Sequence, residues 1–410
     1  MDGPEAGDGP RQPRLGAVLT GLCVTEIVSW GVLYYAFPVL APSIRADTGW
    51  SPSLTTAAFS GALVVAAIVG IPVGRLLDRH GPRAIMTIGS VLATAACVVI
   101  AWSPNLIIFA VGWLLAGVAM AGILYQAAFA ALTRWYGSRR VRALTAVTLV
   151  AGLASTVFAP LTDALNSVLD WRGVLTVLAI GLAVITIPVH AIVLRRRWPA
   201  DIAPAAHAAV DLDRHVATVQ RSREFWFLTA GLTLASIATF AVLINLVALL
   251  TERGLSSALA AWTLGLGGVG QVAGRMFYPA LARRIGVRAR TLIIFGLVAI
   301  TTAVLALVPG PTGALIVIVM IAGVARGIGT LLQATAVPDR WGALAYGRIS
   351  GVLAAPVTFA SALAPWIGTT LAILVGGYPA MFGVLAVLAT VAVILLGFSV
   401  PRRPPDHRPT

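Results

Sequence analysis

The chain has 410 residues, of which 59% are hydrophobic and 11% are charged, and its formal net charge is +14. A soluble globular protein carries roughly 25% charged residues, so this composition excludes an ordinary soluble domain. All 29 basic residues are arginines, and they gather in alternate short loops rather than on one soluble face, which argues against nucleic-acid binding. Repeated apolar stretches of about 20 residues are what a hydrocarbon core of ~30 Å requires of a helix.

Twelve such stretches predict twelve membrane-spanning helices. They cover residues 15–41, 54–74, 84–103, 105–133, 142–168, 173–194, 225–250, 257–282, 290–308, 313–337, 347–375 and 378–400. If the N-terminus is cytoplasmic, the cytoplasmic segments hold 24 arginines, and the opposite side holds Arg45, Arg172 and Arg253. Arginine-rich loops stay in the cytoplasm, so we expect both termini there and the spans in the cytoplasmic (inner) membrane.

An internal repeat predicts that the chain consists of two related halves. The charged stretch at residues 74–83 reads as a short turn between two apolar runs, and a weaker copy at 279–288 follows 205 positions later. We therefore expect a cytoplasmic tail at 1–14, a six-helix bundle at 15–194, a cytoplasmic central loop at 195–224, a second bundle at 225–400 and a tail at 401–410. An even number of spans per half makes the repeat parallel.

The first copy of this stretch resembles the signature loop between helices two and three of the major facilitator superfamily. The resemblance extends from residue 15 to 400, and it implies an all-α membrane protein whose two bundles rock around a central cavity. Asp78 is expected to face the positive end of span eleven and to pair with Arg134 or Arg79, which would close the cytoplasmic side. In the second half Arg283 replaces the acid, so this latch is expected on one side only. The expected gating residues are Gly74, which would allow close helix approach, Asp78, Arg79, Arg83 and Arg134; alternatively, the arginines only set the topology.

A narrower resemblance is to monocarboxylate transporters and the bacterial oxalate–formate branch. It rests on Tyr-Ala-Phe-Pro at 35–38, the arginine pair at 139–140 and Gly-Arg at 274–275. In that family an arginine of helix eight binds the substrate carboxylate, and this position is Arg275. Val39 stands where monocarboxylate transporters usually carry a lysine. The Gly-Pro element of drug–proton antiporters is absent, since this chain has Ala-Pro at 159–160.

Three charged residues, Glu26, Arg275 and Arg326, fall inside predicted spans. A charge at bilayer depth costs roughly 3 kcal/mol, so such residues usually face a cavity. Their repeat-related positions hold Gly231, Gly70 and Met120, so the scaffold itself does not need them. A guanidinium pairs bidentately with a carboxylate, so we expect the arginines to bind a small anion.

Glu26 is then either a counter-ion of an arginine or the group that couples transport to protons. Arg326 could instead pair structurally, with Glu26 or with backbone carbonyls. Tyr34, Asn245 and Gln271 are further candidate substrate ligands, although each could equally tie helices together.

The expected function is a secondary transporter that moves a small organic anion, a monocarboxylate, by alternating access. An exporter of a drug or natural product and a membrane receptor that does not transport are the alternatives. No constellation suited to catalysis appears, so we expect no enzyme, no cofactor and no metal. The expected partners are the anion, protons as coupling ion and the lipid bilayer, with no nucleic acid, and the chain is expected to be a monomer.

Overall fold

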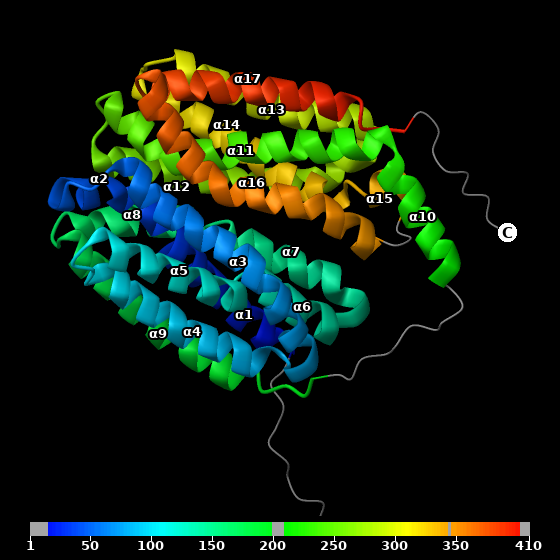
Figure 1. Ribbon diagram of the computed structural model, residues 1–410, viewed down its shortest axis with the longest axis horizontal. Helices are drawn as coiled ribbons and strands as arrows, with labels where there is room; N and C mark the ends of the chain where they lie inside the picture. The colour runs from blue at the N-terminus through cyan, green and yellow to red at the C-terminus, as the bar shows by residue number, and fades with distance from the viewer. Residues whose placement is uncertain (1–14, 199–208, 343–345, 402–410) are drawn as a thin grey trace, which may run out of the picture.

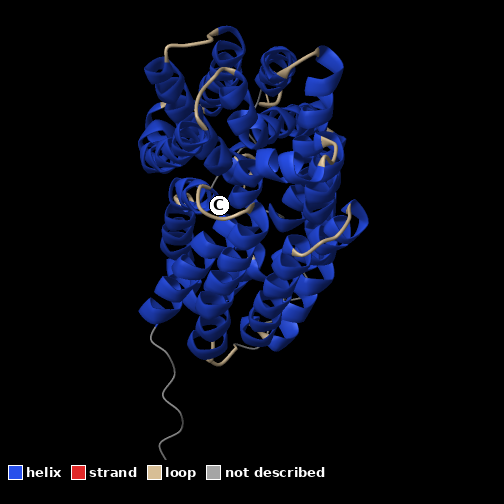
Figure 2. Ribbon diagram, turned by 90° about the vertical axis from the view of Figure 1, so that its left-hand side faces the viewer, coloured by secondary structure: helices blue, strands red, loops and turns tan. Residues whose placement is uncertain are grey.

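The computed structural model describes residues 15–198, 209–342 and 346–401, and these fold into helices without a strand (Figures 1 and 2). In the first half α1 (Leu15–Trp30) continues through the π-helix η1 (Gly31–Tyr35) into α2 (Ala36–Thr48). It is followed by α3 (Pro52–His80), α4 (Pro82–Ala101), α5 (Leu106–Ile123), α6 (Tyr125–Tyr136), the short 3-10 helix η2 (Gly137–Arg139), α7 (Arg140–Ala151), α8 (Ala154–Asn166) and α9 (Trp171–Val193).

The second half begins with α10 (Ala209–Arg221) and continues with α11 (Arg223–Glu252) and α12 (Ser257–Arg284). The remaining helices are α13 (Val287–Leu307), α14 (Thr312–Thr335), α15 (Pro338–Trp341), α16 (Tyr346–Val375) and α17 (Tyr378–Gly397). The expected all-α membrane fold is confirmed. Eleven helical segments of the described chain are long and apolar enough to span a membrane; α12 has the length, 28 residues, but its glycines make it less apolar.

Helix ends follow from side chains that satisfy the first free backbone N–H groups. Ser222 begins α11 by accepting a hydrogen bond from the Phe225 N–H at 3.3 Å, and Asp170 begins α9 in the same way at the Gly173 N–H. The expected turn at 74–83 is instead mostly helix, because α3 continues to His80. α3 ends only at Gly81, whose φ of +77° suits glycine.

The two halves repeat the same close helix packing, which supports the internal repeat. A Cβ added at Gly117 of α5 would overlap the backbone carbonyl of Ala62 in α3. At the matching place in the second half, a Cβ at Gly323 of α14 would overlap the carbonyl of Gly267 in α12. In the first half α3 and α5, and in the second half α12 and α14, therefore approach each other through equivalent small residues.

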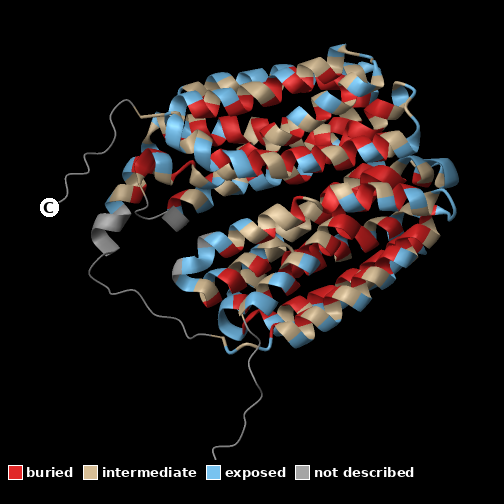
Figure 3. Ribbon diagram, turned by 180° about the vertical axis from the view of Figure 1, so that it is seen from behind, coloured by how far each residue is buried: buried red, intermediate tan, exposed pale blue. Residues whose placement is uncertain are grey.

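The halves contact each other at the end of the molecule away from both termini. The Ser53 hydroxyl of α3 lies 2.7 Å from that of Thr370 in α16, and the Ser60 hydroxyl accepts the Trp366 N–H at 3.1 Å. The Thr156 hydroxyl of α8 donates to the Gly265 carbonyl of α12 at 2.8 Å. Toward the other end, where α6, α7 and α15 lie, the halves draw apart (Figures 1 and 3).

The central loop is not only a polar tether, because part of it forms α10. Residues 199–208 of the loop lie outside the described residues. Val216 and Val219 of α10 are buried against the second half, in a cluster with Phe225 and Trp341. Apolar residues three positions apart lie on one face of a helix, which is the pattern of an amphipathic helix on a bundle.

Candidate functional site

Helix one is distorted in the segment that carries the candidate residues of the first half. Its α-helix widens into the π-helix at Gly31–Tyr35, where the Ala36 N–H bonds to the Gly31 carbonyl five residues earlier. Pro38 follows Tyr34 by four residues and has no N–H, so the Tyr34 carbonyl cannot form its α-helical bond. Single π turns inside α-helices are frequent at functional sites.

The fourth and fifth membrane spans of the first half, α5–α6 and α7–α8, are also interrupted. α5 and α6 are separated by Leu124, whose backbone is extended, and α7 and α8 are separated by Gly152 and Leu153. Interrupted helices leave backbone groups available to ligands and side chains, and they mark the binding sites of many transporters. In the second half α11, α12 and α14 run without such a break.

A cavity of about 270 Å³ lies between the halves beside these interruptions. Helix one contributes Trp30 and Tyr34, the start of α6 contributes Tyr125, and α11 contributes Phe240. The Trp30 ring lies 5.3 Å from that of Tyr34 and 5.1 Å from that of Tyr125. The wall is therefore mostly apolar and aromatic, which suits the body of an organic molecule.

Arg275 of α12 reaches across from the second half to the first. Its Nη1 donates a hydrogen bond to the backbone carbonyl of Thr148, at the end of α7. Gly152 permits this approach, because a Cβ there would lie 3.0 Å from Nη1. Arg275 is only 7% exposed and lies within electrostatic reach of Tyr125, a residue of the cavity wall. It does not line the cavity itself, so it lies next to it, not in it.

Arg326 of α14 belongs to the second half, as Arg275 does. Its Nη2 donates to the Gln271 Oε1 at 3.0 Å, and Gln271 precedes Arg275 by one helical turn on α12. Arg326 interacts electrostatically with Tyr34, Tyr35 and Arg275. Gln271 therefore connects the elements that carry the two arginines.

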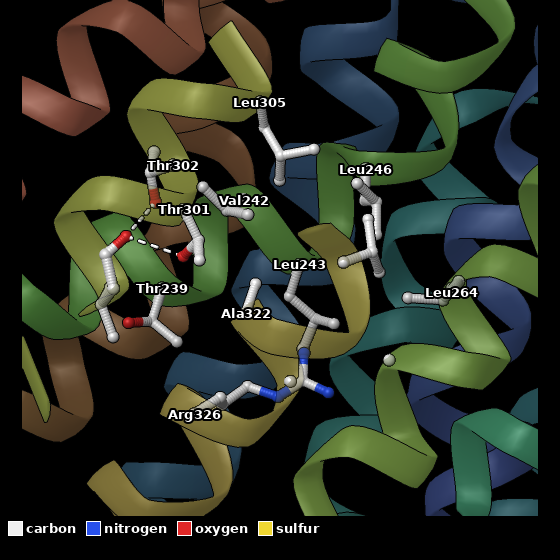
Figure 4. Close-up of a pocket in the computed structure, with 14 residues that line it drawn as sticks. Thr239, Val242, Leu243, Leu246, Leu264, Thr301, Thr302, Leu305, Ala322 and Arg326 are labelled. Carbon is white, nitrogen blue, oxygen red and sulfur yellow. Dashed lines mark hydrogen bonds between the residues drawn. The ribbon is translucent and has the colours of Figure 1, made fainter. Parts of the chain in front are cut away.

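A small cavity of about 40 Å³ within the second half adjoins Arg326 (Figure 4). The hydroxyls of Thr301 and Thr302 on its wall both donate to the Val298 carbonyl. Among the residues that the structure describes, neither Arg275 nor Arg326 forms an ion pair with a carboxylate. Buried Arg275 and half-buried Arg326 therefore lie near each other without an acidic partner among the described residues.

Glu26 is fully buried in helix one and pairs with neither arginine. The Trp30 indole N–H donates to its Oε2 at 3.0 Å, and its Oε1 has no hydrogen-bond partner within the described ranges. The counter-ion interpretations of Glu26 and of Arg326 are therefore wrong for this conformation. The Tyr34 hydroxyl is likewise buried and without a partner in the described part of the chain.

Asn245 lies away from the arginines. Its Nδ2 donates to the Ala241 carbonyl, and its Oδ1 accepts a hydrogen bond from the Thr369 hydroxyl at 2.8 Å. Thr369 also lies 3.2 Å from the Thr56 hydroxyl of α3, so this network joins the halves at their contacting end. Asn245 is thus placed to tie helices together rather than to contact a ligand beside Arg275.

The expected gating residues form contacts within the first half. Arg134 lies 3.8 Å from the carboxylate of Asp78 and donates to its backbone carbonyl, and the Arg83 Nε donates to the Ala191 carbonyl at 2.8 Å. Arg79 is exposed. The expected close approach of a helix at Gly74 is absent from this conformation, because a Cβ added there would meet nothing within 4 Å.

The second half has an ion pair of its own, formed within that half, so the one-sided latch stays a prediction. Arg290 at the start of α13 pairs with Asp339 of α15, and Arg340 beside it donates to the Ser399 carbonyl. Burial lowers the pKa of Arg340 to about 10. Arg283 occupies the position aligned with Asp78, whereas the acid of this ion pair, Asp339, follows α14.

Sequence reasoning also missed the docking point of Arg275 on α7 and the contribution of Trp30 and Phe240 to the cavity. A backbone carbonyl carries no sequence signal of its own. Gly152, a glycine inside an apolar span, was the one available indication of a close approach.

These features define a polytopic membrane protein in which two six-helix bundles enclose a cavity near Arg275 and Arg326. A sequence model of the Major Facilitator Superfamily matches residues 22–355, and the chain belongs to this family of transporters.

Monocarboxylate transporter 11 of Homo sapiens is 28% identical over 299 residues, which cover 72% of this chain and 60% of that protein. Monocarboxylate transporter 13 of Bos taurus is 26% identical over 76% of this chain and 70% of its own length. The cephamycin export protein CmcT of Amycolatopsis lactamdurans is 33% identical, but over only 39% of this chain and 34% of its own.

The fold is similar to that of solved transporters at low sequence identity. A bacterial homolog of the human lysosomal transporter Spinster, in an inward-facing and unoccupied conformation, superposes with a TM-score of 0.73 at 14% identity. That comparison covers 96% of this chain and 98% of the other. The nucleoside transporter NupG gives a TM-score of 0.73 at 12% identity, covering 92% and 98% of the two chains.

Proposed function

We propose that this transporter moves a small monocarboxylate with an apolar body across the cytoplasmic membrane by alternating access. One observation carries the proposal: Arg275 and Arg326 have no carboxylate partner in the described ranges, and each interacts electrostatically with a tyrosine in the wall of a mostly apolar cavity between the halves, Arg275 with Tyr125 and Arg326 with Tyr34. A planar guanidinium recognises a carboxylate through two parallel hydrogen bonds. The aromatic wall would hold the remainder of the substrate.

The bond between Arg275 and Thr148 suggests how binding and movement are linked. A substrate carboxylate competes with the backbone carbonyl of Thr148 for the same guanidinium, and the charged acceptor is the stronger of the two. Because Arg275 and Thr148 belong to different halves, this exchange changes a contact between the bundles. A ligand shifts a conformational equilibrium only through such differential contacts.

We place both termini in the cytoplasm on the basis of the arginine distribution. The end at which the halves draw apart is then cytoplasmic, and the conformation faces inward. In the opposite state, the proposed gating residues of the first half would meet the second half and close that end. These residues are Gly74, Asp78, Arg79, Arg83 and Arg134.

Glu26 is the proposed proton carrier. It is fully buried, and its Oε1 has no partner among the described residues, so an ionised carboxylate there has no compensating cation. It also interacts electrostatically with Tyr125 in the cavity wall, which places it beside the proposed substrate. Proton uptake and release at Glu26 would couple transport to a proton gradient.

The test is uptake of radiolabelled monocarboxylates into liposomes that contain the purified protein and carry an imposed proton gradient. Parent protein should accumulate substrate, whereas Arg275→Ala should lose at least about 100-fold in uptake, since a guanidinium–carboxylate contact is lost. The matched control is Arg288→Ala, which removes an exposed arginine at the start of α13. If parent and Arg275→Ala transport equally, the anion-binding role is refuted.

Export of a natural product is a second candidate function, favoured by the apolar cavity wall and by the partial similarity to a cephamycin export protein. Liposomes again separate the two. Efflux of uncharged or cationic dyes, without any carboxylate transport, would favour the exporter.

A further inference from the structure

A second cavity, of about 600 Å³, lies at the end of the molecule where the halves meet. We call it the outer pocket; residues from both halves line it, among them Phe37, Arg45, Thr56, Ile244, Glu252 and Tyr378. It shares no lining residue with the cavity beside Arg275. Its volume is within the range of small-molecule sites.

The hydrogen-bond network at the contacting ends of the halves forms the floor of the outer pocket. Thr56 of α3, Asn245 of α11 and Thr369 of α16 are hydrogen-bonded to one another and all line it. The pocket is therefore lined by the contact that joins the halves, and a ligand there would touch both of them.

Two opposite charges stand on the two sides of the pocket. Arg45 of α2, from the first half, is exposed, and its side chain forms no hydrogen bond or ion pair with any described residue. Glu252, at the end of α11 in the second half, accepts the Tyr378 N–H on Oε2 at 3.0 Å. Arg45, Glu252 and Tyr378 all line this pocket.

The wall between these charges is apolar. Phe37 and Ile244 line it from opposite halves, and both are almost fully buried. A suitable ligand has a carboxylate for Arg45, a cation for the free oxygen of Glu252 and an apolar body. Both charged side chains are exposed to solvent. A monocarboxylate alone would contact only Arg45, and a cation alone would contact only Glu252, whereas a ligand that carries both charges contacts both.

We propose that the outer pocket binds an apolar α-amino acid, such as leucine, as its zwitterion. The carboxylate lies on Arg45, the ammonium group lies on Glu252, and the side chain packs against Phe37 and Ile244. Since the ligand bridges the two halves at their contacting end, it stabilises the conformation in which that end is closed. This site is independent of the anion proposed for the cavity beside Arg275.

The experiment is equilibrium binding of radiolabelled leucine to the purified full chain in lipid nanodiscs. Arg45→Ala and Glu252→Gln should each weaken binding roughly 10-fold or more, because each removes a charge-assisted contact. Glutamine keeps an acceptor for the Tyr378 N–H, so the start of α17 is retained. Arg288→Ala and Glu224→Gln, an acid in the first turn of α11, are the matched controls and should bind as the parent does.

Two competitors test the dipolar recognition. 4-Methylpentanoate lacks the ammonium group and 3-methylbutylamine lacks the carboxylate, and each should displace leucine at least roughly 10-fold less well than unlabelled leucine does. No leucine binding, or binding unchanged in both Arg45→Ala and Glu252→Gln, would overturn the proposal.

Arg275→Ala separates this site from the transport site, and it should bind leucine as the parent does. Leucine binding that disappears in Arg275→Ala would place the amino acid in the central cavity. That result refutes the outer site and leaves the arginine-based transport proposal standing.

Discussion

Replacing Gly274 with alanine tests whether the packing of α12 on α14 positions the arginines. A Cβ at Gly274 would lie 3.0 Å from the Cα and carbonyl carbon of Val324 and closer still to its oxygen. Backbone cannot rotate away as a side chain can, so α12 must move off α14 by something on the order of 1 Å. Arg275 follows Gly274 directly, and the bond between Gln271 and Arg326 spans the same interface.

The magnitude follows from two opposing effects. Overpacking costs about 1–3 kcal/mol, whereas exchanging glycine for alanine in a helix gains up to about 1 kcal/mol. The variant should therefore be less stable by roughly 0–3 kcal/mol. A misplacement of about 1 Å can reduce the rate of a precisely oriented step about 100-fold, so transport should fall much more than stability.

The assay compares the melting temperature in detergent with the initial rate of liposome uptake. Gly181→Ala in α9 is the matched control, because a Cβ there would meet nothing within 4 Å. It should melt at or slightly above the parent temperature and transport normally. If Gly274→Ala behaves like Gly181→Ala in both measurements, the packing argument is refuted.

The remaining predictions concern the acid, the second-half ion pair and the amide. Glu26→Gln should flatten the pH dependence of uptake while substrate binding persists, and a profile with the parent's slope would rule out Glu26 as the proton carrier. Arg290→Ala should lower the melting temperature more than Asp78→Asn does, because Arg290 is buried although its partner Asp339 is partly exposed; the loss should stay below the roughly 3–5 kcal/mol of a fully buried pair, whereas Asp78→Asn at the exposed pair should cost about 1 kcal/mol or less. Equal shifts would contradict the burial argument. Gln271→Leu should weaken substrate binding by releasing Arg326, and unchanged binding constants by calorimetry would show that this bond does not position the arginine.

The fold was accessible from the sequence because bilayer thickness dictates helix length. Most predicted spans end within a few residues of the observed helices. Two spans are exceptions: α3 continues to His80, and helix one continues past Pro42 to Thr48 and ends only at Gly49, where φ is +67°. The expected span ended where polar residues begin, but polarity stops a membrane span without stopping a helix.

The site was only partly accessible. The positions of Arg275, Arg326 and Glu26 inside spans pointed to them, and the structure brings the arginines together through Gln271. Their partners could not be predicted, because Thr148 contributes a carbonyl and because the rotation of each helix about its axis decides what Glu26 meets. Asn245 shows the same limit, since nothing in its sequence position separates a helix tie from a ligand contact.

The central claim is that Arg275 binds a carboxylate that competes with the Thr148 carbonyl. Its most direct test is the binding constant of a radiolabelled monocarboxylate for Arg275→Ala and Arg275→Lys, measured beside the parent in nanodiscs. The account predicts that alanine abolishes binding and that lysine restores part of it, because a point charge replaces the bidentate fork. Binding in Arg275→Ala that equals the parent's would contradict the account.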